Sequence, residues 1–508
     1  MIKMNFKKIN MKYYIILLSF LFLQNNAIAF DTVEAVSCQQ ADSLSLVHFY
    51  QNSGGPNWAI QWDFNQPISS WHGISLNSTG CVSKIELVNI IEGSIDPQIG
   101  NFSQLESLIL MGEGIYGGLP SSIANLQLLK TLVVKNISGP FPQAIMNLTN
   151  LESLCYFMKN NGTTGSLPND IGNLVKLKEL SISGSLSGSI PSEIGNLIDL
   201  ERLQLKSNFL TGSIPSQIGV LTKLKILEIS NTIISGQIPQ EIASLNKLEI
   251  LNLSGNNMDG AIPSGISGLS NIREIKLNNN LLVGPIPNTI SNLTQLVRLS
   301  LNGNQLSGPI PPELSLLDKL EYLNLGYNQL QGTIPSELGD LINLKILDIQ
   351  HNSFTGELPI ELGELINIQK FKFDHNNFTG DIPYSFGNLE NIEKLYVGFN
   401  NMSGCFDIAL SKLCQKSPLY IIDQGNNFTT AFNNFCLTGQ GECDCSHIRN
   451  IQNIIYTDSY NASHSIISDG TINLTDDVLF TAGQTIDLLR NFSVPQNTSF
   501  EAKIEDCN

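Results

Sequence analysis

One 24-residue phrase recurs through the middle of the chain, between Gly188 and Val397, and it first reads GSIPSEIGNLIDLERLQLKSNFLT. The proline of its Ile-Pro or Leu-Pro pair returns every 24 residues, at Pro191, Pro215, Pro239, Pro263, Pro287, Pro311, Pro335, Pro359 and Pro383. A fixed period of this length indicates a solenoid, because one repeat cannot bury its own apolar face and must stack on its neighbours. The usual expectation that 508 residues make several globular domains therefore does not apply.

The apolar positions of the repeat predict a strand of the form L-x-x-L-x-L. In one coil we expect Leu248, Leu251 and Leu253 to point inward, while Asn252 and Ser254 point outward. Stacked strands lie roughly 4.8 Å apart, so about fourteen coils would form a parallel sheet on the order of 65 Å long.

The polar and special residues of the repeat predict its turns. An Asn after each strand has an amide that can satisfy backbone groups where the chain leaves the sheet. The following Gly permits a positive φ, and the Pro starts a short helical turn. The Asn column consists of Asn208, Asn256, Asn280, Asn304, Asn328, Asn352, Asn376 and Asn400. Other residues replace it at Glu113, Ile137, Lys159, Ser185 and Thr232, which we interpret as drift.

The consensus L-x-x-L-x-L-x-x-N-x-L-x-G-x-I-P-x-x-I-G-N-L-x-x closely resembles the plant-type leucine-rich repeat over roughly two thirds of the chain. This resemblance implies an α/β repeat fold, a leucine-rich-repeat solenoid with a curved parallel sheet on the concave face and short helical turns on the convex face. The cap before the repeats lacks the Cys-x-Trp-x-Gly-Val-x-Cys pair of plant proteins, since Ser69-Ser70-Trp71-His72-Gly73-Ile74-Ser75-Leu76 stands there. Exported bacterial proteins of this repeat class are a better match than plant receptors.

The N-terminus has the pattern of a signal peptide over residues 1–29. Lysines precede the apolar run YYIILLSFLFL, and Ala27-Ile28-Ala29 offers a cleavage site. The alternative is an uncleaved anchor helix, although the run is too short to span a bilayer comfortably. We therefore expect a secreted or cell-surface protein without a membrane span, cleaved near Ala29.

Residues 30–88 are predicted to form an N-terminal cap. Its segment ADSLSLVHFYQNS places Leu44, Val47, and Tyr50 or Phe49 at helical spacing. Trp58, Trp62 and Trp71 follow, and we expect them to cover the apolar end of the first repeat rather than to bind a ligand.

The remaining segments are the solenoid at 89–404, a cysteine-rich C-terminal cap at 405–445 and a small all-β module at 446–508. Short apolar runs split by Gly, Asn and Asp predict the strands of that module. Its resemblance to the β-stack modules of exported bacterial proteins covers about sixty residues.

The chain has nine cysteines, and an exported protein is expected to pair most of them. We expect Cys155, alone inside the array, to stay free. Metal binding at the Cys-Asp-Cys of Cys443 to Cys445 is the less favoured alternative to disulfides. The disulfide candidates are Cys38, Cys81, Cys405, Cys414, Cys436, Cys443, Cys445 and Cys507.

Several function classes are disfavoured. The net charge of −17, or −21 without the four leader lysines, opposes binding to nucleic acid. We find no nucleophile, base and orienting group at a recognisable spacing, so we expect neither an enzyme nor a cofactor nor a metal.

The remaining expectation is an extracellular binding protein that recognises a protein, peptide or glycan on its concave face. Aromatic and charged residues gather toward the C-terminal end of that face, and such residues are common interface anchors. A merely solvated sheet is the competing interpretation. The candidate ligand-binding residues are Tyr322, Tyr327, Asp348, His351, Lys372, Asp374, His375, Tyr396 and Phe399.

A structural adhesion protein or an inhibitor of an extracellular hydrolase remains an alternative function. An ice-binding surface is disfavoured, because the residues before Ile-Pro form no threonine column.

Overall fold

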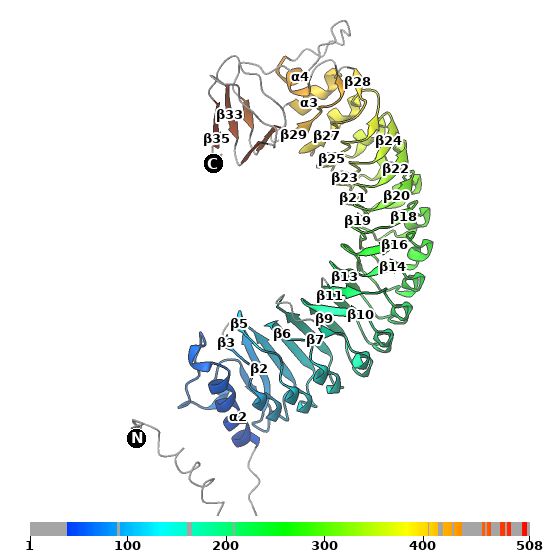
Figure 1. Cartoon of the computed structure of the whole chain (residues 1–508). Coiled ribbons are helices and arrows are strands. Elements are labelled where there is room, and N and C mark those ends of the chain that lie inside the picture. The colour runs from blue at the N-terminus through cyan, green and yellow to red at the C-terminus, as the bar shows by residue number, and fades with distance from the viewer. Residues whose placement is uncertain are drawn as a thin grey trace, which may run out of the picture.

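The computed structural model describes residues 38–438 apart from 89–91, 160–164, 207–208, 405, 415–419 and 429–430, and five short strands beyond them. The described coils stack into a curved solenoid, with α2 (Cys38–Asn52) at one end of the arc (Figure 1). Within these residues no helix has the length and apolarity needed to cross a membrane.

A single 16-stranded sheet lines the inner side of the arc (Figure 1). Its first two strands pair antiparallel and every later pair is parallel, as the repeat predicts. The strands are, in spatial order, β1 (Ile74–Leu76), β2 (Val82–Val88), β4 (Ser107–Met111), β6 (Thr131–Ile137), β7 (Ser153–Met158), β9 (Glu179–Ser183), β11 (Arg202–Lys206), β13 (Ile226–Ser230), β15 (Ile250–Asn252), β17 (Glu274–Lys276), β19 (Arg298–Ser300), β21 (Tyr322–Asn324), β23 (Ile346–Asp348), β25 (Lys370–Lys372), β27 (Lys394–Tyr396) and β29 (Tyr420–Ile422).

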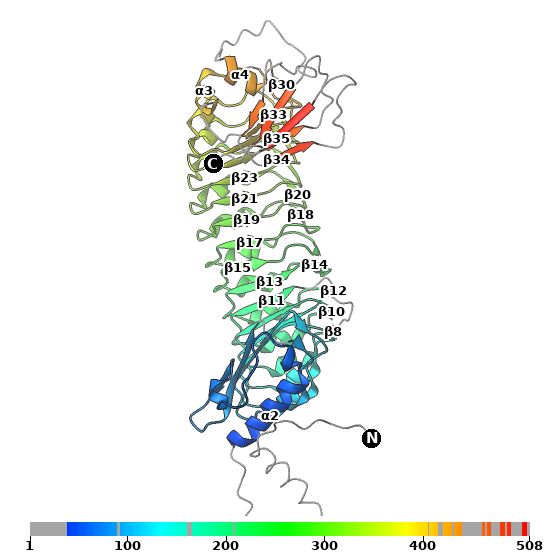
Figure 2. The same cartoon turned by 90° about the vertical axis from the view of Figure 1, so that its left-hand side faces the viewer.

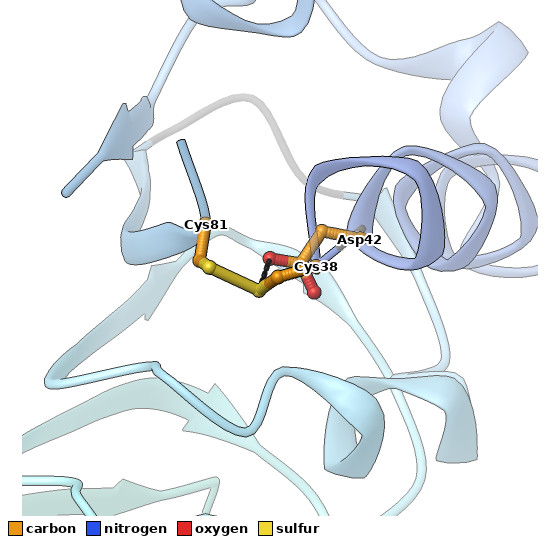
Figure 3. Close-up of side chains that lie close together, drawn as sticks. All are labelled: Cys38, Asp42 and Cys81. Carbon is orange, nitrogen blue, oxygen red and sulfur yellow. Dashed lines mark hydrogen bonds between the residues drawn. A yellow bond between two sulfur atoms is a disulfide. The ribbon is translucent and has the colours of Figure 1, made fainter. Parts of the chain in front are cut away.

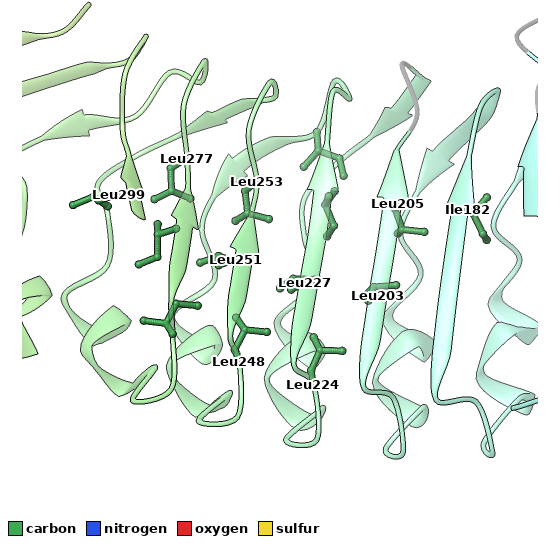
Figure 4. Close-up of a cluster of buried hydrophobic side chains, with 14 of the residues drawn as sticks. Ile182, Leu203, Leu205, Leu224, Leu227, Leu248, Leu251, Leu253, Leu277 and Leu299 are labelled. Atoms are coloured by element: carbon green, nitrogen blue, oxygen red, sulfur yellow. The ribbon is translucent and has the colours of Figure 1, made fainter. Parts of the chain in front are cut away.

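The core is a continuous column of aliphatic side chains between the sheet and the outer turns. Leu248, Leu251 and Leu253 are fully buried, and their equivalents in adjacent coils point the same way (Figure 4). Asn252 and Ser254 between and after them are only half-buried, which confirms the predicted alternation. Each coil therefore shares its apolar contacts with the next one.

Short 3-10 turns form the outer side of the arc. For example, Pro191 holds an extended backbone just before the turn Ser192–Asn196, and Gly188 has a φ of 75°, both as predicted. These turns are η4 (Pro97–Asn101), η5 (Ser121–Asn125), η6 (Gln143–Asn147), η7 (Asn169–Asn173), η8 (Ser192–Asn196), η9 (Ser216–Val220), η10 (Gln240–Ser244), η11 (Ser264–Gly268), η12 (Asn288–Asn292), η13 (Pro312–Leu316), η14 (Ser336–Asp340), η15 (Ile360–Glu364), η16 (Tyr384–Asn388) and η17 (Ile408–Leu410).

A second series of strands runs along the flank of the solenoid, beside the long sheet (Figure 2). These strands also pair in parallel, for example β10 with β12. They are β3 (Glu92–Gly93), β5 (Gly114–Ile115), β8 (Gly165–Ser166), β10 (Leu186–Ser189), β12 (Phe209–Thr211), β14 (Ser235–Gln237), β16 (Asn257–Asp259), β18 (Val283–Gly284), β20 (Gln305–Gly308), β22 (Gln329–Gly332), β24 (Ser353–Gly356), β26 (Asn377–Phe378), β28 (Ser403–Gly404) and β30 (Asn427–Phe428).

The asparagine column ties each coil to the coil before it. The Asn304 amide donates to the backbone oxygens of Leu277 and Leu301 at 3.0 and 2.9 Å, and its oxygen accepts from Leu282 N at 3.1 Å. The same pattern holds from Asn256 to Asn400, and Asn426 extends it by one coil. The column is therefore structural, as predicted, although Asn208 lies outside the described residues.

Where the asparagine is missing, other polar side chains bond backbone groups nearby. Lys159 Nζ donates to the backbone oxygens of Glu113 and Ile115 at 2.8 and 3.0 Å. The hydroxyl of Thr232 bonds the Asn256 side chain and accepts from Ile234 N. The drift of the sequence is thus compensated locally, because buried backbone groups must find partners.

The N-terminal end is closed by an aromatic cluster. The Trp62 and Trp71 rings stack with centroids 5.1 Å apart, and both side chains are buried together with Trp58. η2 (Gly55–Asn57) and η3 (Ile68–Ser70) connect α2 to this cluster. The tryptophans therefore cover the core, as expected.

The buried face of α2 differs from the prediction. Leu44 is 45% exposed, while Leu46, Phe49 and Tyr50 are buried. The expected helix forms, but it is rotated so that Leu46 rather than Leu44 faces the core. The sequence offers leucines on both sides of this helix, and packing against η4 selects one side.

Within the N-terminal cap, a disulfide joins α2 to the residue that precedes β2. Cys38 is bonded to Cys81, and Asp42 lies beside them (Figure 3). The Asp42 carboxylate accepts a hydrogen bond from Val82 N at 2.7 Å, which fixes the start of β2 against the helix. Burial raises the pKa of Asp42, and the Val82 hydrogen bond opposes that rise.

The C-terminal end is closed by two short helices, α3 (Ser411–Cys414) and α4 (Phe432–Thr438). A disulfide between Cys414 and Cys436 joins them, and Phe406 packs between Phe428 and Phe432. Cys155 is free, as expected. The remaining disulfide candidates, Cys405, Cys443, Cys445 and Cys507, lie outside the described residues.

The tail contains the predicted short strands. Three of them form one parallel sheet, namely β31 (Tyr460–Ala462), β33 (Val478–Ala482) and β35 (Phe500–Ile504). The other two form a parallel pair, β32 (Ser465–Ser468) and β34 (Thr485–Leu488).

Candidate functional site

All nine candidate ligand-binding residues lie on four consecutive coils, those of β21, β23, β25 and β27. Strand register brings them together, because Asp348 pairs with Lys372 and Lys372 with Tyr396 across adjacent strands. Residues at equivalent positions of successive repeats are therefore neighbours in space.

Four aromatic rings from these coils form one continuous stack, which we call the ring ladder. It consists of Tyr327, His351, His375 and Phe399, and its successive centroids are 4.3, 4.0 and 4.4 Å apart. The planes of neighbouring rings differ by only 15 to 23°. The interior rings therefore cover each other's faces, and the ladder presents ring edges to solvent.

Every residue of the ring ladder has a left-handed backbone. Their φ angles lie between 51 and 56°. Equivalent positions in earlier coils hold residues that adopt this conformation easily, namely Gly255, Asn279 and Gly303. A bulky residue in this region costs about 1–3 kcal/mol, so four successive coils carry a local cost that their neighbours avoid.

An aspartate supports the centre of the ladder. Asp374 Oδ2 lies 3.0 Å from His375 Nδ1, while Asp374 Oδ1 is buried and has no hydrogen-bond partner. Burial lowers the pKa of His351, and the nearby His375 lowers it further, while Asp374 and Asp348 oppose the shift. The ladder is thus an electrostatically coupled group rather than a set of isolated rings.

An ion pair between a buried aspartate and a half-buried lysine lies beside the ladder. Lys372 Nζ is 3.1 Å from Asp348 Oδ2, and Asp348 is only 3% exposed. Burial raises the pKa of Asp348, and the charge of Lys372 opposes that rise. Since Asp348 does not reach the surface, we expect it to hold Lys372 in place rather than to touch a ligand itself.

Tyr322 begins the site on its N-terminal side. Arg298 lies over the Tyr322 ring, with its guanidinium carbon 4.3 Å from the centroid, and also pairs with Glu274. Arg298 and Glu274 were not predicted as site residues, because neither is unusual in its own coil. The register of β17, β19 and β21 is the feature that places Glu274 beside Arg298 and Arg298 beside Tyr322.

A separate hollow of about 280 Å³ lies along the edge of the middle coils. Its lining consists of long polar and charged side chains, including Lys247, Glu249 and Arg273.

Comparison with known proteins matches the repeats to one family. The model described as "Leucine-rich repeat region" matches residues 95–213 and 208–331, and "Leucine Rich Repeat" matches 343–365 and 367–389. Together these ranges cover more than half of the chain.

Three solved structures illustrate the likeness. The plant peptide hormone receptor RGFR1, in complex with RGF2, is 26% identical with a TM-score of 0.64, over 85% of this chain and 75% of the receptor. The TDR receptor is 31% identical with a TM-score of 0.61, over 65% of this chain and 57% of that one. A leucine-rich-repeat protein of Leptospira interrogans is 26% identical with a TM-score of 0.58, over 78% of this chain and 97% of that one.

TM-scores above 0.5 show that these structures share the fold of this chain. The chain belongs to the leucine-rich-repeat family and is a leucine-rich-repeat protein of the plant type.

Proposed function

We propose that the protein is an extracellular binding protein that recognises an extended peptide, free or as part of a larger protein, along the ring ladder, without catalysis. The observation that carries this proposal is the left-handed backbone of Tyr327, His351, His375 and Phe399. Strained residues cluster at functional sites, because a local cost persists where another interaction requires it.

The ladder is accessible to such a ligand. Tyr327 is 52% exposed, Phe399 is 40% exposed, and the His375 side chain is 40% exposed. Aromatic and histidine side chains are rigid anchors that lose little conformational entropy when they bind. The flanking Lys372, Tyr396 and Tyr322 add polar contacts on the same face.

The orientation of the rings favours a peptide over a glycan. A sugar ring packs its C–H groups against an open aromatic face, whereas the faces inside the ladder are already covered. Ring edges carry positive electrostatic potential and, in His and Tyr, hydrogen-bonding groups. Such edges suit the carbonyl oxygens of a peptide backbone.

The comparisons support the same class of ligand. RGFR1, a plant peptide hormone receptor solved in complex with RGF2, shares the fold of this chain. The predicted leader and the disulfides at both ends agree with an extracellular location.

Selection from a displayed library of random peptides tests the proposal. Peptides selected on the wild-type chain should lose at least about hundredfold in affinity, about 2.7 kcal/mol, for the quadruple variant Tyr327→Asn/His351→Asn/His375→Asn/Phe399→Asn. Asparagine accepts the left-handed backbone, as Asn279 does in this protein. The control is Tyr116→Asn/Tyr384→Asn, two tyrosines at least as exposed but outside the long sheet.

Equal affinity for the quadruple variant and the wild type would refute the assignment. An equal loss of peptide affinity in the quadruple variant and in the control would indicate non-specific binding to aromatic side chains. An adhesion role without a peptide ligand would yield no selected peptide above background.

A further inference from the structure

Three potential metal ligands converge at the centre of the ring ladder. His351, Asp374 and His375 each offer one donor atom, and these three atoms lie within 4.8 Å of one another. They come from two adjacent coils, because His351 follows β23, and Asp374 and His375 follow β25. The stacking of the solenoid, not sequence proximity alone, assembles this group.

We propose that His351, Asp374 and His375 bind a divalent transition-metal ion of the zinc class. Imidazole and carboxylate are common protein ligands of zinc, and three of them leave a fourth position for water or for a group of a bound molecule. This site does not depend on the peptide proposal, because the metal ion itself is the ligand.

The Asp374–His375 pair already has a suitable spacing. Its oxygen and nitrogen are 3.0 Å apart, and two ligands about 2.0–2.1 Å from a tetrahedral zinc ion lie roughly 3.3 Å from each other. A metal ion would take the place of the proton that these two atoms share, so that His375 Nδ1 ligates the ion as neutral imidazole.

The buried oxygen of Asp374 is an independent observation in favour of a cation. Asp374 Oδ1 has no hydrogen-bond partner, and a buried carboxylate oxygen without one is costly. No lysine or arginine forms an ion pair with Asp374 among the described residues. A bound divalent ion would supply the missing positive charge to this carboxylate.

Metal binding requires one rearrangement. The His351 and His375 rings are nearly parallel, so their in-plane lone pairs cannot meet at one ion. The His351 ring must turn toward Asp374, which breaks its contact with Tyr327 or His375. His351 is only half-buried, so the turn needs no movement of the core.

The other group of three potential ligands in the described chain does not compete with this site. Cys38, Asp42 and Cys81 also lie close together, but the two sulfurs are bonded to each other (Figure 3). A disulfide provides no thiolate ligand.

Titration with Co²⁺ and Zn²⁺ tests the site directly. The full exported chain, treated with chelator and dialysed, is titrated with Co²⁺ while visible absorption is followed, and Zn²⁺ then displaces the cobalt. We expect one ion per chain. Each of His351→Asn, His375→Asn and Asp374→Asn should weaken binding at least about tenfold, as is typical when a ligand or its partner is lost.

The repeat supplies templates for these variants, so each should fold. Asn279 occupies the position of His351 and His375 in an earlier coil, with the same positive φ, and Asn278 occupies the position of Asp374. The control is His48→Asn/His72→Asn, which removes two exposed histidines of the N-terminal cap and should leave metal affinity unchanged.

Two results would overturn the proposal. One is the absence of stoichiometric cobalt or zinc binding to the wild-type chain. The other is binding that persists unchanged in any of the three single variants, which would place the ion elsewhere. Neither result depends on peptide binding, which is measured separately, so the failure of one proposal is distinguishable from the failure of the other.

Discussion

The rings of His351 and His375 stack at a centroid distance of 4.0 Å although both residues have a left-handed backbone, with φ of 51 and 56°. A favourable aromatic pair contributes about 0.5–1.5 kcal/mol, and each left-handed residue costs about 1–3 kcal/mol. Stacking thus offsets only part of the backbone cost. The ladder is better explained by binding than by stability.

The stability of the protein should depend on pH through His351. Burial and the neighbouring His375 hold the pKa of His351 below its ordinary value of 6.5, so protonation favours the unfolded chain. The stabilisation is complete above pH 6.5 and is lost as the pH falls through the pKa of the folded state. Thermal unfolding of wild type and His351→Asn between pH 7.5 and 5 measures the effect.

The difference in stability between wild type and His351→Asn reports His351 together with its electrostatic coupling to His375, Asp374 and Asp348. We expect the wild type to lose more stability than the variant on acidification. A parallel decline of both proteins over this range would contradict the assignment.

Asn304→Ala should destabilise the solenoid. The substitution leaves Leu282 N without its partner, and an orphaned buried group costs about 1–3 kcal/mol. Leu277 O and Leu301 O lose one of two amide donors each, since the side chains of Asn280 and Asn328 still donate to them. The nearby Asn302→Ala is the control, because Asn302 is only half-buried and is not part of the asparagine column. Urea unfolding followed by circular dichroism compares them, and equal midpoints would show that the column is not structural.

Tyr156→Phe should stabilise the protein by about 1 kcal/mol. The Tyr156 hydroxyl is buried without a hydrogen-bond partner, and burial alone raises its pKa far above the ordinary range. Removing the hydroxyl leaves the ring contact with Phe141 intact. The matched substitution Tyr116→Phe, at an exposed tyrosine, should change the melting temperature little. A lower melting temperature for Tyr156→Phe would reveal a partner for this hydroxyl.

Loss of the N-terminal disulfide should destabilise the cap. Cys38→Ser/Cys81→Ser opens a cross-link between residues 43 positions apart, which typically costs about 2–5 kcal/mol. Cys155→Ser, at the free cysteine, serves as control. Hydrogen exchange of α2 and β2 reports the effect locally, and unchanged protection there would show that the aromatic cluster alone holds the cap.

Much of the fold could be predicted from the sequence, because the same 24-residue pattern recurs many times and each copy predicts the same strand and turns. The inward leucines follow from the period of two along each strand, and the role of Asn304 follows from the need to pair buried backbone groups. The face of α2 could not be predicted, since Leu44 and Leu46 are chemically equivalent and only tertiary contacts distinguish them.

The sequence predicted which residues of the candidate site lie side by side on adjacent coils. It did not predict that four of their rings stack face to face. Register places His351 beside His375, yet the ring planes depend on side-chain rotamers and on the left-handed backbone. Asp348 was predicted as a surface residue by its position between two strand leucines. The approach of Lys372 and Gln350 covers it, and no pattern within one coil shows this.

Photo-crosslinking tests the central claim, that the ring ladder contacts the ligand, most directly. A benzophenone amino acid is placed at Tyr396, beside the ladder, or at Tyr384, on the outer turn η16, and each protein is irradiated with a selected peptide. We predict a crosslinked product from position 396 and none from position 384. Crosslinking from position 384 alone, or equally from both positions, would contradict the account.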